Sequence, residues 1–496
     1  MSILVLILVL AGLLVTGGLC WYYRGYLKNT FNKNKKKIVA IGTAGALLSI
    51  GGSGLLIPEG YRPPTETLIR NSNGNYWAAT GANIQNAIDD LTTPGTVWLP
   101  SGTITIDAEL NLDDDIALVG CGVGATTIYS DESGAFDAIN IIGKSNVTLK
   151  SFTLDMNSKG QQGIYVTSGA VDVRIDDIYI YHYGLAQGIY CTGGANHIYI
   201  SNLKIVAGDV ACKHGIGMTG VNDSRVDNAV FINNYPDVSE DAFDVGGAND
   251  CHNITYNNID IYGWYDGCKV AGSDTGAKNV ILSNIKIHGV DNIGLKLQGQ
   301  YVTVDGFFIE NCPKGIASNT GGDHMNICNG FIRNCGIGLY LADGSPENVS
   351  VSNVEIDTTT TYGIALKGKN MQFTNVRTLN AGTYNKISTG SSYILMDNCI
   401  FLNGGNIGLS IDGSSHFKIT NCIIKGNTGV GLATTLVACN NYTIMGCTFE
   451  DNGEALDTHA SDDWNIITLN TVVDGETFDA NSKTKGITTN NLGADI

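Results

Sequence analysis

The sequence predicts an all-β protein, a single-stranded parallel β-helix of about 12 to 13 turns. Three observations predict this fold: a short motif recurs, apolar and polar residues alternate within it, and no helix-length segment separates its copies. Short alternating strands without intervening helices are the pattern of a solenoid, in which each turn stacks on the one before. The 63 glycines and only 8 prolines fit many short strands joined by tight turns.

The repeating unit reads Asn-X-X-Ile, followed some eight residues later by Gly-apolar-X-apolar, and it recurs at intervals of roughly 21 to 27 residues. Asn202–Ile205 and Asn258–Ile261 are examples of the first half, and Gly188–Cys191 and Gly294–Leu297 of the second. An asparagine suits a corner of the solenoid because its amide can bond to the equivalent amide one turn away. It also tolerates the backbone geometry of a corner.

The N-terminal segment precedes the repeat and is apolar. Ile3 to Cys20 is an almost unbroken apolar run, long enough to span a bilayer, and a basic loop separates it from a second charge-free run that ends at Ile57. The positive-inside rule keeps the loop in the cytoplasm and places the rest of the chain outside. One span with a re-entrant second segment, and a signal peptide, are the alternatives.

The whole chain is therefore divided as follows: a transmembrane helix at 1–23, a basic cytoplasmic loop at 24–37, a second transmembrane segment at 38–57, a linker at 58–79, a cap with the first turns at 80–135, the β-helix at 136–474 and a tail at 475–496. The net charge of −18 is divided unevenly, because residues 1–57 hold six basic and no acidic side chains. The remainder carries 23 basic and 47 acidic side chains. Such a surface repels nucleic acid, so the sequence predicts no nucleic-acid partner.

The start of the solenoid carries a recognisable set of motifs. Ala82–Leu91 has helical apolar spacing, Gly95–Gly102 reads as a strand and turn, and Ile116–Gly124 as a glycine-rich strand end. This stretch resembles the first turn of the pectate-lyase superfamily. The resemblance implies a right-handed β-helix whose helix caps the open end of the first turn. That superfamily contains polysaccharide lyases, glycoside hydrolases, epimerases, phage tailspikes and proteins without known activity, so the resemblance indicates a fold and no single reaction.

Aligning the turns on the Gly-apolar step predicts which outward side chains become vertical neighbours. The residues just before the glycine, or before Ala242 in its place, read Gln162, Gln187, His214, Asp241 and Asp266. The residues two after it read Tyr165, Tyr190, Gly217, Asp244, Lys269 and Lys296, and then Ala317, Tyr340, Ala365 and Ser410. Parallel strands lie about 4.8 Å apart, so the first part of each row predicts a compact charged patch, and the last four residues predict a bland surface.

The charged patch supplies the candidate catalytic residues. Glycoside hydrolysis needs one protonated and one ionised carboxyl group, and Asp241, Asp244 and Asp266 are the candidates, with His214 assisting. Alternatively, Lys269 or Lys296 neutralises a uronate or acts as the base of a β-elimination, in which case the carboxylates would hold Ca²⁺. Solvation alone is a further reading, because the outside of a solenoid has to be polar.

Aromatic residues concentrate beside the charged patch, and a ring with a polar tip suits a carbohydrate ligand. The candidate substrate-binding residues are Tyr165, Tyr190, Tyr262, Trp264 and Tyr265. The 13 cysteines contain no CxxC pair, so no metal site of the zinc type is expected. Several follow Asn at the start of a strand, which indicates buried, stacked thiols; disulfides are the alternative.

Together these features predict a membrane-anchored surface protein. Residues 1–57 would hold the lipid bilayer, and the extracellular β-helix would bind a polysaccharide or surface glycan. If the protein is an enzyme, it is a polysaccharide lyase or a glycoside hydrolase. The alternative is a non-enzymatic structural or adhesive spike of a cell envelope or virion. The sequence leaves open whether the protein is a homo-oligomer, because it carries no heptad or other assembly signal.

Overall fold

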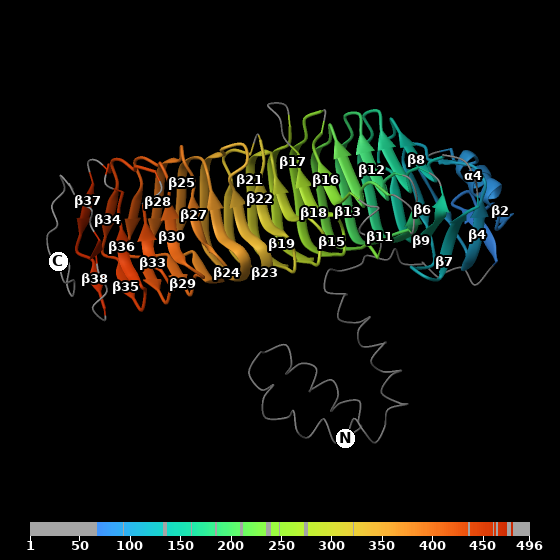
Figure 1. Cartoon of the computed structure of the whole chain (residues 1–496). Coiled ribbons are helices and arrows are strands. Elements are labelled where there is room, and N and C mark those ends of the chain that lie inside the picture. The colour runs from blue at the N-terminus through green and yellow to red at the C-terminus, as the bar shows by residue number, and fades with distance from the viewer. Residues whose placement is uncertain are drawn as a thin grey trace, which may run out of the picture. The chain divides into compact units, whose positions relative to one another are not determined.

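The computed structural model describes residues 67–479 with short gaps. The gaps are 93, 132–135, 160, 184–185, 209–211, 235–239, 248, 272–275, 321, 435–436, 460, 463–464 and 474–477. This part is a parallel β-solenoid of about 14 turns, stacked in chain order from the blue to the red end in Figure 1. The turn count exceeds the expected 12 to 13 because turns without the Asn-led motif come before residue 136.

The predicted membrane segments 1–23 and 38–57, the basic loop 24–37 and nearly all of the tail 475–496 lie outside the described residues. Across residues 67–479, where described, no helix has the length and apolar character to cross a bilayer.

Each full turn contributes one strand to each of three parallel ladders, here called faces A, B and C. Face A consists of β5 (Leu110–Asn111), β8 (Ile139–Ile142), β10 (Ile164–Thr167), β12 (Ile189–Thr192), β14 (Ile216–Thr219), β16 (Asp241–Val245), β18 (Asp266–Val270), β20 (Ile293–Leu297), β22 (Lys314–Ser318), β27 (Tyr384–Ile387), β30 (Ile407–Ile411), β33 (Val430–Ala433), β36 (Glu454–Asp457) and β39 (Phe478–Asp479). Face B begins with β3 (Gly95–Trp98) and β6 (Ile116–Val119) and ends with β25 (Lys369–Thr374), β28 (Ser392–Asp397), β31 (Lys418–Thr420), β34 (Thr443–Met445) and β37 (Ile466–Thr468). Face C begins with β4 (Gly102–Ile106) and β7 (Thr126–Ser130) and ends with β26 (Arg377–Ala381), β29 (Ile400–Leu402), β32 (Ile423–Lys425), β35 (Thr448–Glu450) and β38 (Thr471–Val472).

Long strands that run from face B round a corner to face C fill the middle of both ladders. They are β9 (Thr148–Lys159), β11 (Val171–Tyr183), β13 (Asn196–Ala207), β15 (Asn222–Ile232), β17 (His252–Tyr262), β19 (Lys278–His288), β21 (Gln300–Glu310), β23 (Asn326–Leu341) and β24 (Glu347–Leu366); the last two continue onto face A. Alternate residues of each strand point inward and stack on the equivalent residue of the next turn. One such column on face B is Ile200, Val226, Tyr256, Leu282 and Val304, all buried. Each apolar side chain buried in this way contributes about 1.5–3 kcal/mol.

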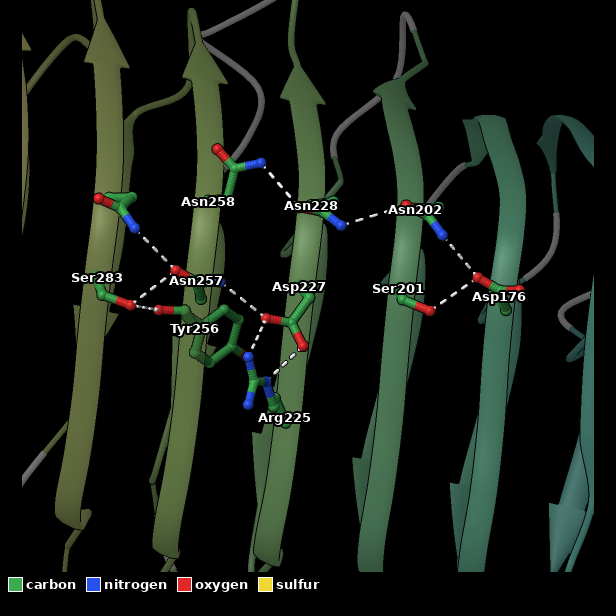
Figure 2. Close-up of polar contacts among 11 residues, drawn as sticks. Asp176, Ser201, Asn202, Arg225, Asp227, Asn228, Tyr256, Asn257, Asn258 and Ser283 are labelled. Atoms are coloured by element: carbon green, nitrogen blue, oxygen red, sulfur yellow. Dashed lines mark hydrogen bonds and ion pairs between the residues drawn. The ribbon is translucent and has the colours of Figure 1, made fainter. Parts of the chain in front are cut away.

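The corner between faces B and C explains the recurring asparagine. Asn202, Asn228 and Asn258 occupy it with φ of 51°, 56° and 56°, the left-handed region in which asparagine costs little. The Asn258 amide donates to Asn228 Oδ1 at 2.8 Å, and the Asn228 amide donates to Asn202 Oδ1 at 3.3 Å. Figure 2 shows this amide ladder crossing successive strands. The prediction of an asparagine corner ladder is confirmed.

The glycine of the second half-motif has a different cause, which is close approach between turns. A Cβ atom on Gly163 would lie 2.5 Å from the carbonyl oxygen of Gly188, and one on Gly188 would lie 2.8 Å from that of Gly215. Contacts below about 3.0 Å are not tolerated. The Gly-apolar step therefore marks the place where the backbone of one face-A strand passes closest to the next.

The N-terminal end of the solenoid is covered, as predicted. The helix α4 (Gly81–Asp89) buries Ile84, Ala87 and Ile88, and its Gln85 side chain both accepts from the Asn111 backbone N–H at 2.8 Å and donates to the Asn111 carbonyl at 3.1 Å. Part of the segment assigned to a linker forms a hairpin of β1 (Leu68–Asn71) and β2 (Tyr76–Ala78). β1 pairs antiparallel with β3, so it covers the first edge of face B.

The cysteines form columns in the interior. None of the 12 described cysteines is in a disulfide, and all but Cys121 and Cys328 are buried. Cys422 contacts the thiols of both Cys399 and Cys447, each one turn away. The prediction of stacked, buried thiols is confirmed for the described residues.

Candidate functional site

Face A brings the predicted charged residues together in the predicted register. Gly215 donates its N–H to the Asp241 carbonyl at 3.2 Å, which sets His214 beside Asp241, and Asp241 pairs directly with Asp266. The second row follows in the order Tyr165, Tyr190, Gly217, Asp244, Lys269 and Lys296. Four consecutive strands of face A, namely β14, β16, β18 and β20, thus bring these residues together on one face.

Four of these residues form a compact cluster, here called the quartet: His214, Asp241, Asp244 and Lys269. His214 Nδ1 lies 3.3 Å from Asp241 Oδ2, and His214 Nε2 lies 3.7 Å from Asp244 Oδ2. Lys269 Nζ lies 3.1 Å from Asp244 Oδ2 and 3.8 Å from Asp241 Oδ2. The imidazole and the ammonium group therefore each bridge the same two carboxylates.

Burial separates the two quartet carboxylates in character. The Asp241 side chain is only 5% exposed, whereas that of Asp244 is 15% exposed. Burial raises the pKa of Asp241, and the nearby Asp244 charge adds to the rise, although His214 and Lys269 oppose it. Burial alone would lower the pKa of Lys269, but the charges of Asp244 and Asp241 outweigh burial and raise it, so Lys269 stays protonated.

Glu240 is a fifth charged group at this site, and it was not predicted. Its Oε2 atom lies 3.6 Å from His214 Nε2, and its side chain is 59% exposed. It precedes β16 in an irregular turn, where strand alternation says nothing about which way a side chain points. Its adjacency to Asp241 in the sequence was the only available signal.

Asp266 lies in the predicted row but differs from the quartet in its environment. It is buried, its Oδ1 accepts from the Asn292 amide at 2.9 Å and from the Ile293 N–H at 3.0 Å, and its Oδ2 lies 3.1 Å from Lys296 Nζ. Both oxygens are thus occupied by the next turn. This arrangement fixes the path of the chain from Asn292 into β20.

An aromatic pair adjoins the quartet on the same face. The rings of Tyr165 and Tyr190 stack with centroids 5.8 Å apart and planes 13° apart. A Cβ atom on Gly217 would lie 3.1 Å from Tyr190 Cδ2, so the glycine leaves room for that ring. Tyr165 and Tyr190 therefore place two stacked, partly exposed rings in the same row as Asp244, with Gly217 between Tyr190 and Asp244.

The other three predicted aromatic residues lie in different settings. Trp264 is fully buried and belongs to the core, so it offers no ring at the surface. Tyr262 is exposed on face C, where it stacks on His288 with centroids 4.8 Å apart. Tyr265 is 46% exposed and immediately precedes Asp266, at the corner leading into face A.

The quartet also bears on the expected cation. His214, Asp241 and Asp244 each offer one ligand atom, and these three atoms lie within 4.8 Å of one another. Ca²⁺ prefers a shell of oxygen atoms, however, and one of the three donors is an imidazole nitrogen. Lys269 also places an ammonium group between the two carboxylates. These residues therefore fit the suggested Ca²⁺ poorly.

The second half of the row is not bland, which corrects the sequence prediction. Ala365 pairs with Lys386, and Lys386 pairs with Ser410, so a lysine was missing from the predicted row. Lys386 Nζ lies 3.5 Å from Oδ2 of the buried Asp412. The Gly-apolar step is absent from this turn, because the register shifts between Tyr384, which pairs with Ile407, and Asn385, which pairs with Leu409, so no residue of β27 pairs with Gly408.

Comparison with protein families agrees with this architecture. Residues 346–492 match the family described as the right-handed β-helix region. Residues 78–269 match the family described as rhamnogalacturonase A/epimerase, pectate lyase-like. The chain is a pectate-lyase-like right-handed β-helix repeat protein.

Comparison with solved structures finds similar proteins at low sequence identity. The pre-mature bacteriophage phi29 gene product 12 is 14% identical, with a TM-score of 0.56 over 80% of this chain and 68% of that one. The tailspike of the E. coli bacteriophage HK620, in complex with a pentasaccharide, is 12% identical, with a TM-score of 0.46 over 79% and 74%. The A-module of an Azotobacter vinelandii mannuronan C-5 epimerase is 15% identical, with a TM-score of 0.38 over 82% and 95%. Among curated proteins, the β-helix repeat protein has no match.

Proposed function

We propose that this β-helix repeat protein binds an extracellular polysaccharide on face A and hydrolyses it at the quartet. The observation that carries the proposal is the unequal pair of carboxylates, Asp241 and Asp244, bridged by His214 and Lys269. Glycoside hydrolysis requires one protonated and one ionised carboxyl group, and burial raises the pKa of Asp241.

Asp241 is assigned the role of general acid. Burial raises its pKa, so it holds a proton to a higher pH than an exposed aspartate and can give that proton to the leaving glycosidic oxygen. Asp244 is more exposed and has Lys269 at 3.1 Å, and it is assigned the role of ionised partner. One oxygen atom of Asp241 lies within 4.8 Å of one oxygen atom of Asp244. That short separation leaves little room for a water molecule and favours direct attack by Asp244 on the sugar.

The charge of the site favours a neutral sugar over a uronate. Lys269 and Lys296, the suggested uronate-binding or β-elimination residues, already lie within 4 Å of the carboxylates of Asp241, Asp244 and Asp266. With Glu240, four carboxylates face two lysines. An anionic polymer would be repelled by this balance, so hydrolysis of a neutral polysaccharide is the better supported reaction.

The aromatic pair supplies the binding surface. The stacked rings of Tyr165 and Tyr190 are partly exposed and lie three and two strands before Asp244 in the same row, so a sugar ring can contact them while a linkage farther along the same chain reaches Asp244. The family matched over residues 78–269, which includes all of these residues, is named for a rhamnogalacturonase and an epimerase. We further propose that residues 1–57 anchor the protein in a membrane and that the solenoid lies outside.

A second candidate function is a rigid, non-enzymatic spike. The observation that favours it is that both quartet carboxylates, as well as Asp266, have a lysine within 4 Å. In this second candidate, the network of ion pairs stabilises the stacking of neighbouring turns and has no catalytic role. The two candidates differ in whether the carboxylates are needed for turnover.

A reducing-end assay on polysaccharides retained from a glycan array distinguishes the candidates. The variant D241N is expected to lower kcat about 100-fold or more, because it removes the acid. D260N is the matched control: its carboxylate pairs with Lys286 at 3.3 Å on face C, away from the quartet. Equal turnover by wild type and D241N would show that the quartet is not the active site, and binding without any cleavage would favour the spike.

A further inference from the structure

Face A carries a second cluster of aromatic and charged residues, here called the tyrosine patch. Its members are Lys314, Tyr340, Asp343, Tyr362, Tyr384, Lys386 and Asp412. The three tyrosines come from consecutive turns, in β23, β24 and β27, and all are partly exposed. The patch lies several turns beyond the quartet and shares no residue with it.

Two contacts hold the Tyr340 side chain, one at its ring and one at its hydroxyl group. Lys314 Nζ lies 4.3 Å from the centre of its ring, and its hydroxyl donates to Asp343 Oδ1 at 3.0 Å. A ring fixed in this way loses little conformational entropy when a ligand packs on it. A tyrosine also offers both an apolar face and a polar tip, which suits a sugar.

Tyr362 and Tyr384 meet edge to face, with ring centroids 5.1 Å apart and an interplanar angle of 67°. Burial, the contact with Tyr362 and the Asp412 charge all raise the pKa of Tyr384, so its hydroxyl stays protonated. Beside them Lys386 lies 3.5 Å from Asp412. The patch therefore offers aromatic surface together with neutral and charged hydrogen-bonding groups, and its two lysines balance its two aspartates.

The tyrosine patch is in register with the quartet. Lys296 pairs with Ala317, Ala317 pairs with Tyr340, and the same row continues through Ala365 to Lys386. At about 4.8 Å per turn, Tyr340 lies about 19 Å and Lys386 about 29 Å along the solenoid from Asp244. No corner intervenes, because all of these residues belong to face A.

We infer that the tyrosine patch is a second subsite for the same neutral polysaccharide, whose chain runs parallel to the solenoid axis and contacts the patch and the quartet at once. This inference rests on the proposed function. One chain that spans two subsites gains avidity, because binding at the first raises the effective concentration at the second. An oligosaccharide too short to cover about 19 Å gains nothing from the patch.

The test compares polymer with short oligosaccharide for Y340A, Y384A and a control, Y393A. Tyr393 is 57% exposed and stacks on His416, with centroids 4.8 Å apart, at the start of face B. The probes are three neutral polymers (dextran, mixed-linkage β-glucan and galactomannan), their di- and trisaccharide fragments, and polygalacturonate as the anionic comparison. The full chain is used in detergent, with affinity measured by gel retardation for polymers and by calorimetry for fragments.

The expected result is that Y340A and Y384A each bind the retained neutral polymer at least 10-fold more weakly, while fragment binding and Y393A stay unchanged. Equal polymer affinity in wild type and both patch variants would overturn the second subsite and leave the proposed function standing. Equal loss of polymer and fragment affinity would also overturn it, because the effect would then come from the fold or the quartet. Retention of polygalacturonate alone, or of none of the polymers, would overturn the neutral-glycan function itself.

Discussion

The close approach of turns at the Gly-apolar step gives a quantitative prediction for G163A. The added Cβ would lie 2.5 Å from the Gly188 carbonyl oxygen, and that oxygen accepts a hydrogen bond from the Ile164 N–H at 3.0 Å. Relief of the clash therefore requires the two turns to separate and that bond to weaken. Overpacking costs about 1–3 kcal/mol and the bond about 1 kcal/mol, so the variant should lose about 2–4 kcal/mol of stability.

The matched control is G169N, at the other end of the same face-A strand. Gly169 has φ of 75°, and no atom lies within 4 Å of the place that a Cβ atom would occupy. Asparagine tolerates that backbone region, so the loss should stay below about 1 kcal/mol. Both variants are compared with wild type by urea unfolding followed by circular dichroism. A G163A midpoint within error of G169N would refute the assignment of the glycine to close packing between turns.

Three further predictions concern the quartet, the corner ladder and the thiols. K269M should cost about 2–3 kcal/mol at pH 7, because it removes the ammonium group between two largely buried carboxylates and leaves the His214 imidazole as the group that bridges them. The exposed-pair control K286M should cost less than about 1 kcal/mol. Burial raises the folded-state pKa of Asp241, so this carboxylate becomes protonated, and no longer needs a cation beside it, as the pH falls toward 3.8. The stability lost in K269M should therefore shrink over that range, and a pH-independent loss in urea titrations would contradict the charge explanation. N258A should cost about 2 kcal/mol and N258G about 1 kcal/mol, because glycine keeps the left-handed backbone and loses only the amide bond. Equal thermal shifts of the two variants would count against the backbone cost, and an unshifted N258G would count against the ladder bond. A thiol reagent should modify Cys121 and Cys328 of the native protein before any other described cysteine, and peptide mass mapping can check this order.

The vertical rows could be predicted from the sequence because parallel stacking places each residue beside the one a single period later. His214, Asp241 and Asp266 could be aligned without coordinates, because the Gly-apolar step fixes the phase of the turns of His214 and Asp266, and Ala242 takes the place of the glycine after Asp241. The alignment missed Lys386 because its turn lacks the Gly-apolar step. No residue of β27 pairs with Gly408, and Asn385 pairs with Leu409 after a register shift, while its side-chain oxygen accepts from the Ile364 N–H at 3.0 Å.

Residues between the strands were the least predictable. Trp264 lies in a turn, where alternation assigns no face, and its large apolar ring is buried in the core instead of facing a ligand. Glu240 stands just before a strand and reaches His214 by a path that no periodicity describes. The environments of Asp266 and Asp241 also differ, although the two aspartates occupy equivalent places in one predicted row. What separates them is the pair of hydrogen bonds that Asp266 accepts from the turn after it.

The amide ladder at the corner has a consequence for how such a molecule can change length. The bonds from Asn258 to Asn228 and from Asn228 to Asn202 join equivalent amides, so one complete coil can be inserted or removed there and the flanking asparagines still find a partner. An insertion between β20 and β22 would move the quartet and the tyrosine patch apart by one increment of about 4.8 Å without altering either. The number of coils between the quartet and the tyrosine patch would therefore set the length of the saccharide that contacts both.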